Sequence, residues 1–330
     1  MFICVHRWLN FALMDAVQIC PKGKLVYGMQ MPITAQSTVF AASWEASAGT
    51  EEILKIAQAC DANGFFYLAV SDHVCVPREQ AKAMSTVWYD TIATLGFLAA
   101  ATQRVRLLSY VYVVPYRHPL MTAKAFATLD ALSGGRVILG VGAGHLQGEF
   151  AALGVDFTQR GKLLDEAIDV IAAAFTDEYP NHSGAIWSVR DVGQRPRPIQ
   201  QPRPPIWVGG STKPALRRAA ERADGWLPQG VPEMGMPAAI EYIRTQRAKV
   251  RGDAPIEIGM NAPWMYVGKP SFEVPPNTRT GTGEALAALL REMKTLGVSH
   301  CGVRFRSRSC DELVNQIAAF GSEVAPLLNG

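Results

Sequence analysis

A repeated alternation between short apolar runs and amphipathic helical patterns constrains the fold of this chain most strongly. Eight runs are rich in β-forming residues and nearly continuous in apolar side chains, which is typical of parallel strands buried on both faces. They cover residues 25–31, 65–70, 105–111, 136–141, 205–210, 225–227, 256–268 and 300–305.

A helical pattern follows each run. In residues 50–63, Ile53, Ile56 and Cys60 form an apolar stripe, Thr50 stands at the capping position, and Asn63-Gly64 ends the pattern. Further helices are predicted over 88–101, 119–131, 161–175, 213–222, 235–251, 282–296 and 311–328. Eight strands, each followed by a helix, predict an α/β fold of the (β/α)8 class, a TIM barrel.

The interval between the fourth and fifth strands is too long for one helix. The surplus, about residues 176–204, contains a strand-like AIWSV and a proline-rich return, so we predict an insertion that ends in extended polyproline. It is either a rigid surface linker or a cover over the barrel mouth that shapes the substrate pocket. Residues 25–330 are predicted to form a single barrel domain, and residues 1–24 an N-terminal extension whose Met14 is an equally plausible start.

Composition narrows the class of protein further. An apolar fraction of 48% in 330 residues excludes intrinsic disorder, and a net charge of +3 argues against nucleic acid or an anionic membrane as the main partner. No run of about 18 apolar residues predicts a membrane span. The six cysteines form no C-x-x-C pair, and no secretory signal is recognisable, so we expect reduced thiols in a cytoplasmic protein.

In a TIM barrel the functional residues stand where strands end. The second strand ends in Asp72-His73, and His73 is a candidate acid/base because histidine titrates near neutral pH. The alternative is a histidine that bonds to a loop carbonyl. After the third strand, Arg117 either meets a phosphate or carboxylate or is a solvated loop charge.

The fourth strand runs into the glycine-rich segment Gly140-Val141-Gly142-Ala143-Gly144-His145. Glycines allow a planar or phosphorylated ligand to approach the backbone. The dinucleotide fingerprint G-x-G-x-x-G fails here, because its third glycine falls on His145 or Gln147. A Rossmann fold is therefore weakly supported.

The fifth strand ends in Gly209, Gly210, Ser211 and Thr212, directly before a helix. Glycines and hydroxyls at a helix N-terminus favour an anion, since free N–H groups and the helix dipole both attract negative charge. The sequence favours a phosphate site here over a simple helix cap.

The histidines do not have metal-site spacing. None of the six forms an H-x-x-x-H or H-E-x-x-H pattern, and His73 with Cys75 supplies only two ligands, so no metal site is predicted. The chain also has no G-x-S-x-G elbow and no Walker A sequence.

Four segments together resemble the luciferase-like monooxygenase superfamily. The strongest match is residues 123–171, with its LDALSGGRVILGVGAG; the others are 71–74 (SDHV), 113–119 (VVPYRHP) and 199–228. The resemblance covers roughly residues 25–310 and implies a (β/α)8 barrel with an inserted segment.

Members of that superfamily use either reduced FMN with oxygen or the deazaflavin coenzyme F420, and this chain resembles the F420 branch more closely. The resemblance implies that His73 lies beside the deazaflavin ring as the catalytic residue. It also implies a non-proline cis peptide near Ser109-Tyr110. The cofactor-binding residues that it implies are Asp72, Ser109, Tyr110, Ala143, Gly144, His145, Gly209, Gly210, Ser211 and Thr212.

The chain departs from one group of its relatives at His145. Deazaflavin sugar-phosphate dehydrogenases carry a glutamate there and other relatives a tryptophan, so sugar-phosphate oxidation is not expected. Glu149 matches a glutamate common in the family, and we predict for it a structural role in a salt bridge.

The resulting hypothesis is a coenzyme F420-dependent oxidoreductase that transfers a hydride between the deazaflavin and a small organic substrate, with His73 moving the proton. Few charges in loops 33–48, 74–87 and 269–281 favour a neutral substrate. One alternative is an FMN-dependent two-component monooxygenase supplied by a separate flavin reductase, and another is a non-catalytic flavin- or deazaflavin-binding barrel. The resemblance also implies a homodimer.

Overall fold

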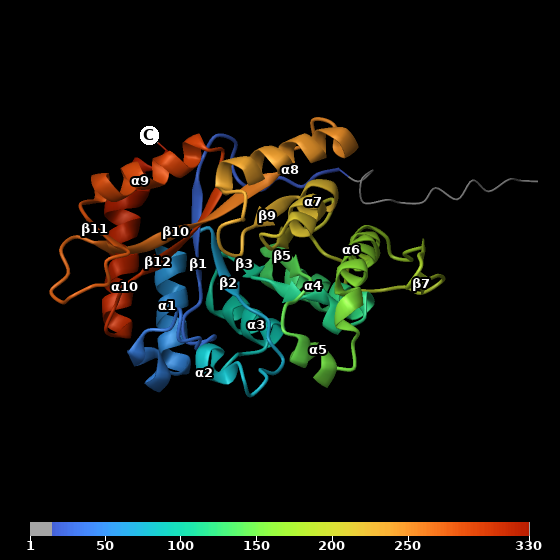
Figure 1. Cartoon of the computed structure of the whole chain (residues 1–330), viewed down its shortest axis with the longest axis horizontal. Helices are drawn as coiled ribbons and strands as arrows, with labels where there is room; N and C mark the ends of the chain where they lie inside the picture. Colours follow the sequence, from blue (N-terminus) through green and yellow to red (C-terminus); the bar gives the residue numbers. More distant parts are fainter. Residues whose placement is uncertain (1–14, 330) are drawn as a thin grey trace, which may run out of the picture.

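A closed barrel of parallel strands surrounded by helices forms the protein (Figure 1). The computed structural model describes residues 15–329, so residues 1–14 of the predicted extension lie outside the described part. Eight strands pair in the order β1-β2-β3-β5-β8-β9-β10-β12, and β12 pairs with β1 to close the ring. The predicted TIM barrel is confirmed.

The barrel strands match the apolar runs of the sequence. They are β1 Val26–Gln30, β2 Tyr67–Val70, β3 Arg106–Ser109, β5 Val137–Gly142, β8 Ile206–Gly209, β9 Gly225–Leu227, β10 Glu257–Val267 and β12 His300–Phe305. A short strand, β4 Tyr112–Val113, continues the path of β3 after a bulge and pairs with β5.

Helices follow the strands as predicted. They are α1 Thr50–Ala62, α3 Thr91–Ala101, α4 Pro119–Ser133, α6 Arg160–Thr176, α7 Lys213–Arg222, α8 Met236–Arg251, α9 Gly283–Thr295 and α10 Cys310–Ala319, with the short α2 Ala81–Met84 and α5 Gln147–Ala152 in loops. The helix predicted from residue 88 begins at Thr91, because the Asp90 side chain accepts a hydrogen bond from the backbone N–H of Ala93 and caps it there.

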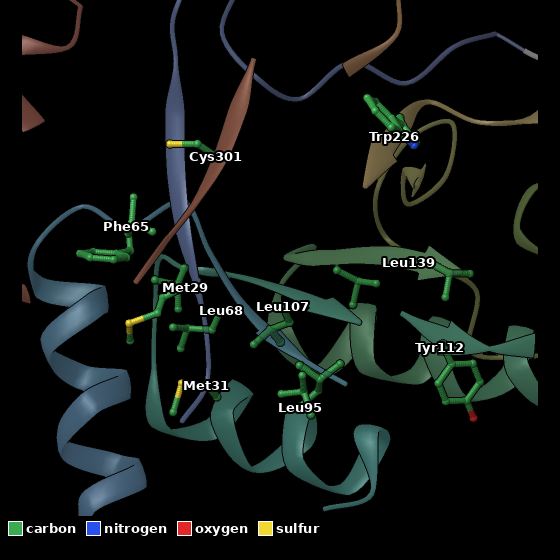
Figure 2. Packing of buried hydrophobic residues seen from close by; sticks show 14 of the residues in the cluster. Met29, Met31, Phe65, Leu68, Leu95, Leu107, Tyr112, Leu139, Trp226 and Cys301 are labelled. Carbon is green, nitrogen blue, oxygen red and sulfur yellow. The ribbon is translucent and has the colours of Figure 1, made fainter. Parts of the chain in front are cut away.

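Both faces of the barrel strands are buried. Outward-facing Leu68, Leu107 and Leu139 pack in the main core between the strands and the helix ring (Figure 2). Tyr67 and Trp207 instead belong to a separate cluster inside the barrel. Burying one aliphatic side chain contributes roughly 2 kcal/mol. Because both faces are buried, the strands appear in the sequence as continuous apolar runs.

The insertion after α6 lies on the outer side of the helix ring. Its hairpin, β6 His182–Ser183 and β7 Ser188–Val189, packs on α6, where Glu166 accepts a hydrogen bond from the Trp187 backbone N–H. In the segment that leads back from the hairpin to β8, the backbone N–H of Gln200 donates a hydrogen bond to Asp130 of α4. Figure 1 shows β7 beyond α6, away from the barrel strands. These contacts support the surface-linker interpretation and not a cover over the mouth.

Residues 15–24, the described part of the predicted extension, lie across the amino ends of the strands. The backbone N–H of Val17 donates to Asp224 before β9, and that of Cys20 donates to Glu257 in β10. Cys20 is buried with the interior cluster. This segment therefore closes the end of the barrel opposite the strand carboxyl ends.

The segment 269–281, expected to be a long loop, contains a strand instead. β11 Thr278–Gly281 pairs with β10, with Trp264 opposite Thr278. The prediction of a loop was wrong at 278–281, because the alternating Thr278 and Thr280 suit the free edge of the long β10. Across the described residues, no helix is long and apolar enough to cross a membrane.

Candidate active site

His73 and Glu149 form the central pair at the carboxyl end of the barrel. His73 follows β2, and Glu149 stands in the first turn of α5 after β5. Nδ1 of His73 lies 2.9 Å from Oε2 of Glu149. Oε1 of Glu149 accepts a 2.6 Å hydrogen bond from the backbone N–H of Val74, and Tyr116 Oη donates to Oε2 at 2.7 Å. The partner of Glu149 is therefore His73, which it holds through a hydrogen bond.

The hydrogen bonds around Glu149 keep its carboxylate charged. Burial alone raises the pKa of Glu149, but hydrogen bonds from His73 and Tyr116 outweigh burial and hold that pKa below its ordinary value. Burial, and then the bond to Glu149, raise the pKa of Tyr116, so its hydroxyl stays protonated as a donor. A charged acceptor fixes the His73 proton on Nδ1. Nε2 makes no hydrogen bond to the described residues.

Two aromatic rings confine the His73 imidazole. The ring of Trp88 lies 4.4 Å away at 65°, and that of His145 lies 5.6 Å away at 85°. Burial, followed by the nearness of His73, lowers the pKa of His145, which favours its neutral form. The structure thus brings together His145 and His73, both of which the family resemblance implied near the cofactor.

Asp72 forms an ion pair within the chain. Its carboxylate binds the Arg117 guanidinium through two bonds of 2.7 and 2.9 Å and accepts from the Val113 backbone N–H at 2.8 Å. Burial lowers the pKa of Arg117, but the bond to Asp72 outweighs this effect and raises it. Arg117 is therefore not a solvated loop charge, and its anionic partner in this structure is Asp72 of the chain itself. Asp72 therefore ties the end of β2 to β4.

A non-proline cis peptide joins Tyr110 and Val111 in the bulge between β3 and β4. It falls within one residue of the position that the family resemblance implied. The Val111 side chain lies between Gly142 and Gly209, and a methyl group at either glycine would overlap it. The glycines at these two strand ends therefore make room for the bulge.

Ser109 and Tyr110 hold this bulge in place. Ser109 is fully buried, donates to the Gly140 carbonyl at 2.8 Å and accepts from the Gly140 N–H at 3.0 Å. Tyr110 Oη donates to the Pro228 carbonyl and accepts from Asn261 Nδ2, each at 3.0 Å. Burial raises the pKa of Tyr110. The Ser109 hydroxyl is fully used by the chain itself.

The last predicted cofactor-binding residues follow β5 and β8. Gly144 has φ +80°, and Ala143 is partly buried beside it. Ser211 Oγ donates to the Gly230 carbonyl and accepts from the Gln229 N–H, each at 3.0 Å, which ties the loop after β8 to the loop after β9. These bonds position the loop that leads into α7.

Thr212 begins α7 without capping it. Its side chain makes no capping bond, so the hydroxyl leaves the backbone N–H groups of Lys213 and Ala215 uncapped; Pro214 between them has no N–H. Gly210, two positions earlier, has φ +117°, a conformation that favours glycine. An uncapped, solvent-accessible helix start of this kind suits an anionic group.

Sequence reasoning did not identify three further site residues: Trp88, Tyr116 and Asn261. Trp88 precedes α3 in the loop that follows β2. Tyr116 lies shortly after β4, so its position near a strand end was the available signal, whereas Asn261 lies in the middle of β10 and had none. Among residues 15–329, no group of three or more His, Cys, Asp or Glu side chains is arranged to hold a metal ion.

The fold and this arrangement define a TIM-barrel protein whose polar side chains converge at the strand carboxyl ends. The chain belongs to the luciferase-like monooxygenase family, whose model matches residues 29–269. An uncharacterised protein from Mycobacterium tuberculosis is 30% identical over 217 residues, covering 62% of this chain and 74% of that protein.

For two relatives with a named activity, the similarity to this chain covers a smaller share of the relative's own length. The FMNH2-dependent dimethylsulfone monooxygenase of Pseudomonas putida is 29% identical over 211 residues, covering 63% of this chain and 56% of that protein. The oxygenase component of a flavin-dependent trigonelline monooxygenase from Acinetobacter baylyi is 30% identical over 161 residues, covering 48% and 42%.

Solved structures share the fold at low sequence identity. Monooxygenase RslO1 from Streptomyces bottropensis superposes with a TM-score of 0.71 at 19% identity, over 92% of this chain and 99% of that one. The coenzyme F420-dependent tetrahydromethanopterin reductase of Methanopyrus kandleri also gives 0.71, at 18% identity over 92% and 99%. These superpositions support the barrel fold.

Proposed function

We propose that this protein is a coenzyme F420-dependent oxidoreductase that transfers a hydride between the deazaflavin and a small organic substrate. The observation that carries the proposal is the His73–Glu149 pair at the barrel mouth, with Nδ1 held by a carboxylate and Nε2 free. The resemblance of residues 123–149 and 71–74 to the F420 branch supports the choice of cofactor.

The residues present fit such a cofactor. The uncapped start of α7, with Ser211 and Thr212 beside it, suits the cofactor phosphate because free N–H groups and the helix dipole attract an anion. The bulge at Tyr110-Val111 and the partly buried Ala143 present an apolar surface for a flat ring. When bound, the deazaflavin supplies a carbon that gives or takes a hydride.

His73 would move the proton that accompanies this hydride. With its proton fixed on Nδ1 by Glu149, Nε2 can accept a proton from a substrate hydroxyl, and in the reverse direction return it. The negative Glu149 then stabilises the imidazolium that forms, and Tyr116 holds the carboxylate in place. Trp88 and His145 shield the imidazole from water.

A second candidate function is an FMN-dependent two-component monooxygenase that receives reduced flavin from a separate reductase. The relatives from Pseudomonas putida and Acinetobacter baylyi, named as flavin-dependent monooxygenases, favour it. Oxygen uptake with FMN, NADH and a flavin reductase, measured across a substrate panel, distinguishes the two. Substrate-dependent uptake supports this second function, whereas F420-dependent turnover without oxygen supports the first.

The direct test is a titration with purified F420 and, separately, with FMN, followed by tryptophan fluorescence. Saturable quenching by F420 is expected; tight FMN binding without any F420 effect would overturn the proposal. His73→Ala and His73→Asn should then lower turnover by roughly 10²–10⁴-fold with unchanged F420 affinity. Full turnover in both variants would remove His73 from the chemistry.

A further inference from the structure

Arg304 lies inside the barrel near its mouth. Along β12, His300 faces inward, where its ring stacks on Trp207, and a methyl group at Gly302 would contact Asn261 inside the barrel. Cys301 and Val303 pack outward in the main core. Since side chains alternate along a strand, Arg304 faces inward, one layer nearer the carboxyl end than Gly302.

Aromatic rings surround the Arg304 guanidinium. Its Cζ lies 5.2 Å from the ring centre of Phe40 and 5.7 Å from that of Trp264. Burial lowers the pKa of Arg304, and the phenols of Tyr110 and Tyr67 oppose this effect. The guanidinium is thus partly desolvated, and the facing rings attract it through cation–π contacts but offer its N–H groups no hydrogen-bond acceptor.

No carboxylate compensates this charge. Among residues 15–329, no acidic side chain lies within ion-pair distance of Arg304, and no hydrogen bond to its guanidinium is formed. Four buried or partly buried arginines are satisfied within the chain: Arg117 and Arg218 by carboxylates, Arg136 and Arg247 by backbone carbonyls. Arg306 also contacts Trp264, with Cζ 3.9 Å from the ring centre, and makes two 3.4 Å hydrogen bonds to Thr278 and Asn277. Arg304 departs from this pattern.

Acidic residues near the strand ends are already engaged elsewhere. Asp72 binds Arg117, and Glu149 binds His73. Glu45, which follows β1, accepts hydrogen bonds from the backbone N–H groups of Ile33 and Ala42. Among residues 15–329, these acidic side chains are therefore not available to Arg304, and a ligand can supply the anion.

We propose that Arg304 binds a carboxylate of the substrate and that the rings of Phe40 and Trp264 contact the apolar body of the same molecule. The planar guanidinium matches a carboxylate through two parallel hydrogen bonds. This inference rests on the proposed function for the identity of the site, and it makes the substrate an organic anion, not the neutral molecule that loop composition favoured.

Benzoate, with neutral benzamide as its isostere, probes this site without any cofactor. Binding is followed by calorimetry and by tryptophan fluorescence, to which Trp264 contributes, at constant ionic strength. Benzoate should bind the wild-type protein and Arg304→Lys, whereas benzamide should bind far more weakly. Arg304→Gln should raise the benzoate dissociation constant by roughly 10- to 100-fold.

Arg279→Gln is the matched control, because it removes the same charge from the exposed edge strand β11. Its benzoate affinity should equal that of the wild type. Equal benzoate binding by Arg304→Gln, or an equal loss in Arg279→Gln, would overturn the proposal. Thermal unfolding of each variant verifies that it is folded. If Arg304→Gln does not fold, the comparison of Arg304→Lys with the wild type still tests the proposal.

A titration of Arg304→Gln with F420 separates this inference from the proposed function. Unchanged F420 affinity with lost benzoate binding supports a substrate site. A matching loss of F420 affinity would assign Arg304 to the cofactor and overturn the inference. Benzoate binding through Arg304 in a protein that binds no F420 would instead contradict the proposed cofactor and leave the anion site intact.

Discussion

His73 Nδ1 lies 2.9 Å from Oε2 of Glu149, although 76 positions separate the two residues in the chain. The barrel brings them together because β2 and β5 both flank β3, and their carboxyl ends open at the same mouth. Glu149 thereby acts through His73: it sets which ring nitrogen carries the proton.

Replacement of Glu149 by Gln should disturb the His73 tautomer. Without the carboxylate, Nδ1 loses the acceptor that fixes its proton, so turnover should fall by roughly 10²–10⁴-fold, as expected when a catalytic imidazole loses its orienting acid. The ¹⁵N shifts of the His73 ring report the tautomer directly, and kcat reports the consequence.

Glu166→Gln is the matched control for Glu149→Gln. Glu166 is in α6, and its Oε1 lies 3.3 Å from Nε2 of His182 in the outer hairpin, away from the barrel mouth. Its replacement should leave kcat unchanged. Glu149→Gln with an intact Nδ1–H tautomer and full turnover would show that His73 does not depend on this carboxylate.

Thr212→Asp should change stability and cofactor affinity in opposite directions. An aspartate at this N-cap can bond to the free N–H groups of α7, which should raise the free energy of unfolding by about 0.5 kcal/mol. Its charge would repel a phosphate at the same place, so the cofactor dissociation constant should rise by at least about tenfold.

The same change at another helix tests whether the effect on affinity is local. Thr282 caps α9 through the Ala285 N–H, so Thr282→Asp keeps a capping acceptor there. It should not alter cofactor affinity. Denaturant unfolding and fluorescence titration measure both quantities, and unchanged cofactor affinity in Thr212→Asp would remove the phosphate from this site.

Gly209→Ala should destabilise the protein by overpacking. The new methyl group would overlap the Val111 side chain in the bulge, at a cost of about 1–3 kcal/mol in the free energy of unfolding. Adding Val111→Ala should recover part of the loss, because the two positions share one space.

Gly96→Ala is the comparison for Gly209→Ala. Gly96 lies in α3, and a methyl group there meets no atom within 4 Å. It should be neutral or stabilising by up to about 1 kcal/mol, since alanine is the better helix former. Denaturant unfolding of Gly209→Ala, Val111→Ala and the double variant, each compared with the wild type, gives the coupling energy between the two positions. Additive effects of Gly209→Ala and Val111→Ala would mean that the side chains do not meet.

His300 should make the fold sensitive to acid. Burial beside Trp207 lowers the pKa of His300 to about 3, whereas an unfolded histidine titrates near pH 6.5. Below about pH 6.5, His300 binds a proton in the unfolded chain but stays neutral in the folded protein. The free energy of unfolding should therefore fall by roughly 1.4 kcal/mol per pH unit between about pH 6 and 4 from this residue alone.

His300→Phe removes that proton while keeping a ring against Trp207. Its unfolding free energy, measured between pH 4 and 7, should fall with acid less steeply than that of the wild type, by about the slope given above. Parallel pH profiles for the two proteins would contradict the assignment of this acid sensitivity to His300.

The alternation of apolar runs and helical stripes was sufficient to predict the barrel, and strand ends were sufficient to place His73 and Ser211 at the barrel mouth. Both signals are local: burial on two faces makes a strand continuously apolar, and a loop after a parallel strand must open at the barrel mouth. The position of the cis peptide at Tyr110-Val111 followed from family resemblance instead.

Pairing between side chains was decided only by the tertiary structure. Nothing in the sequence indicates that Asp72 binds Arg117, that Glu149 binds His73, or that Arg304 has no acidic partner among residues 15–329. These relationships join residues on different strand ends, so they depend on barrel closure and strand register. A single sequence carries the periodicity that creates the barrel, whereas the distances between its loops exist only once the barrel has closed.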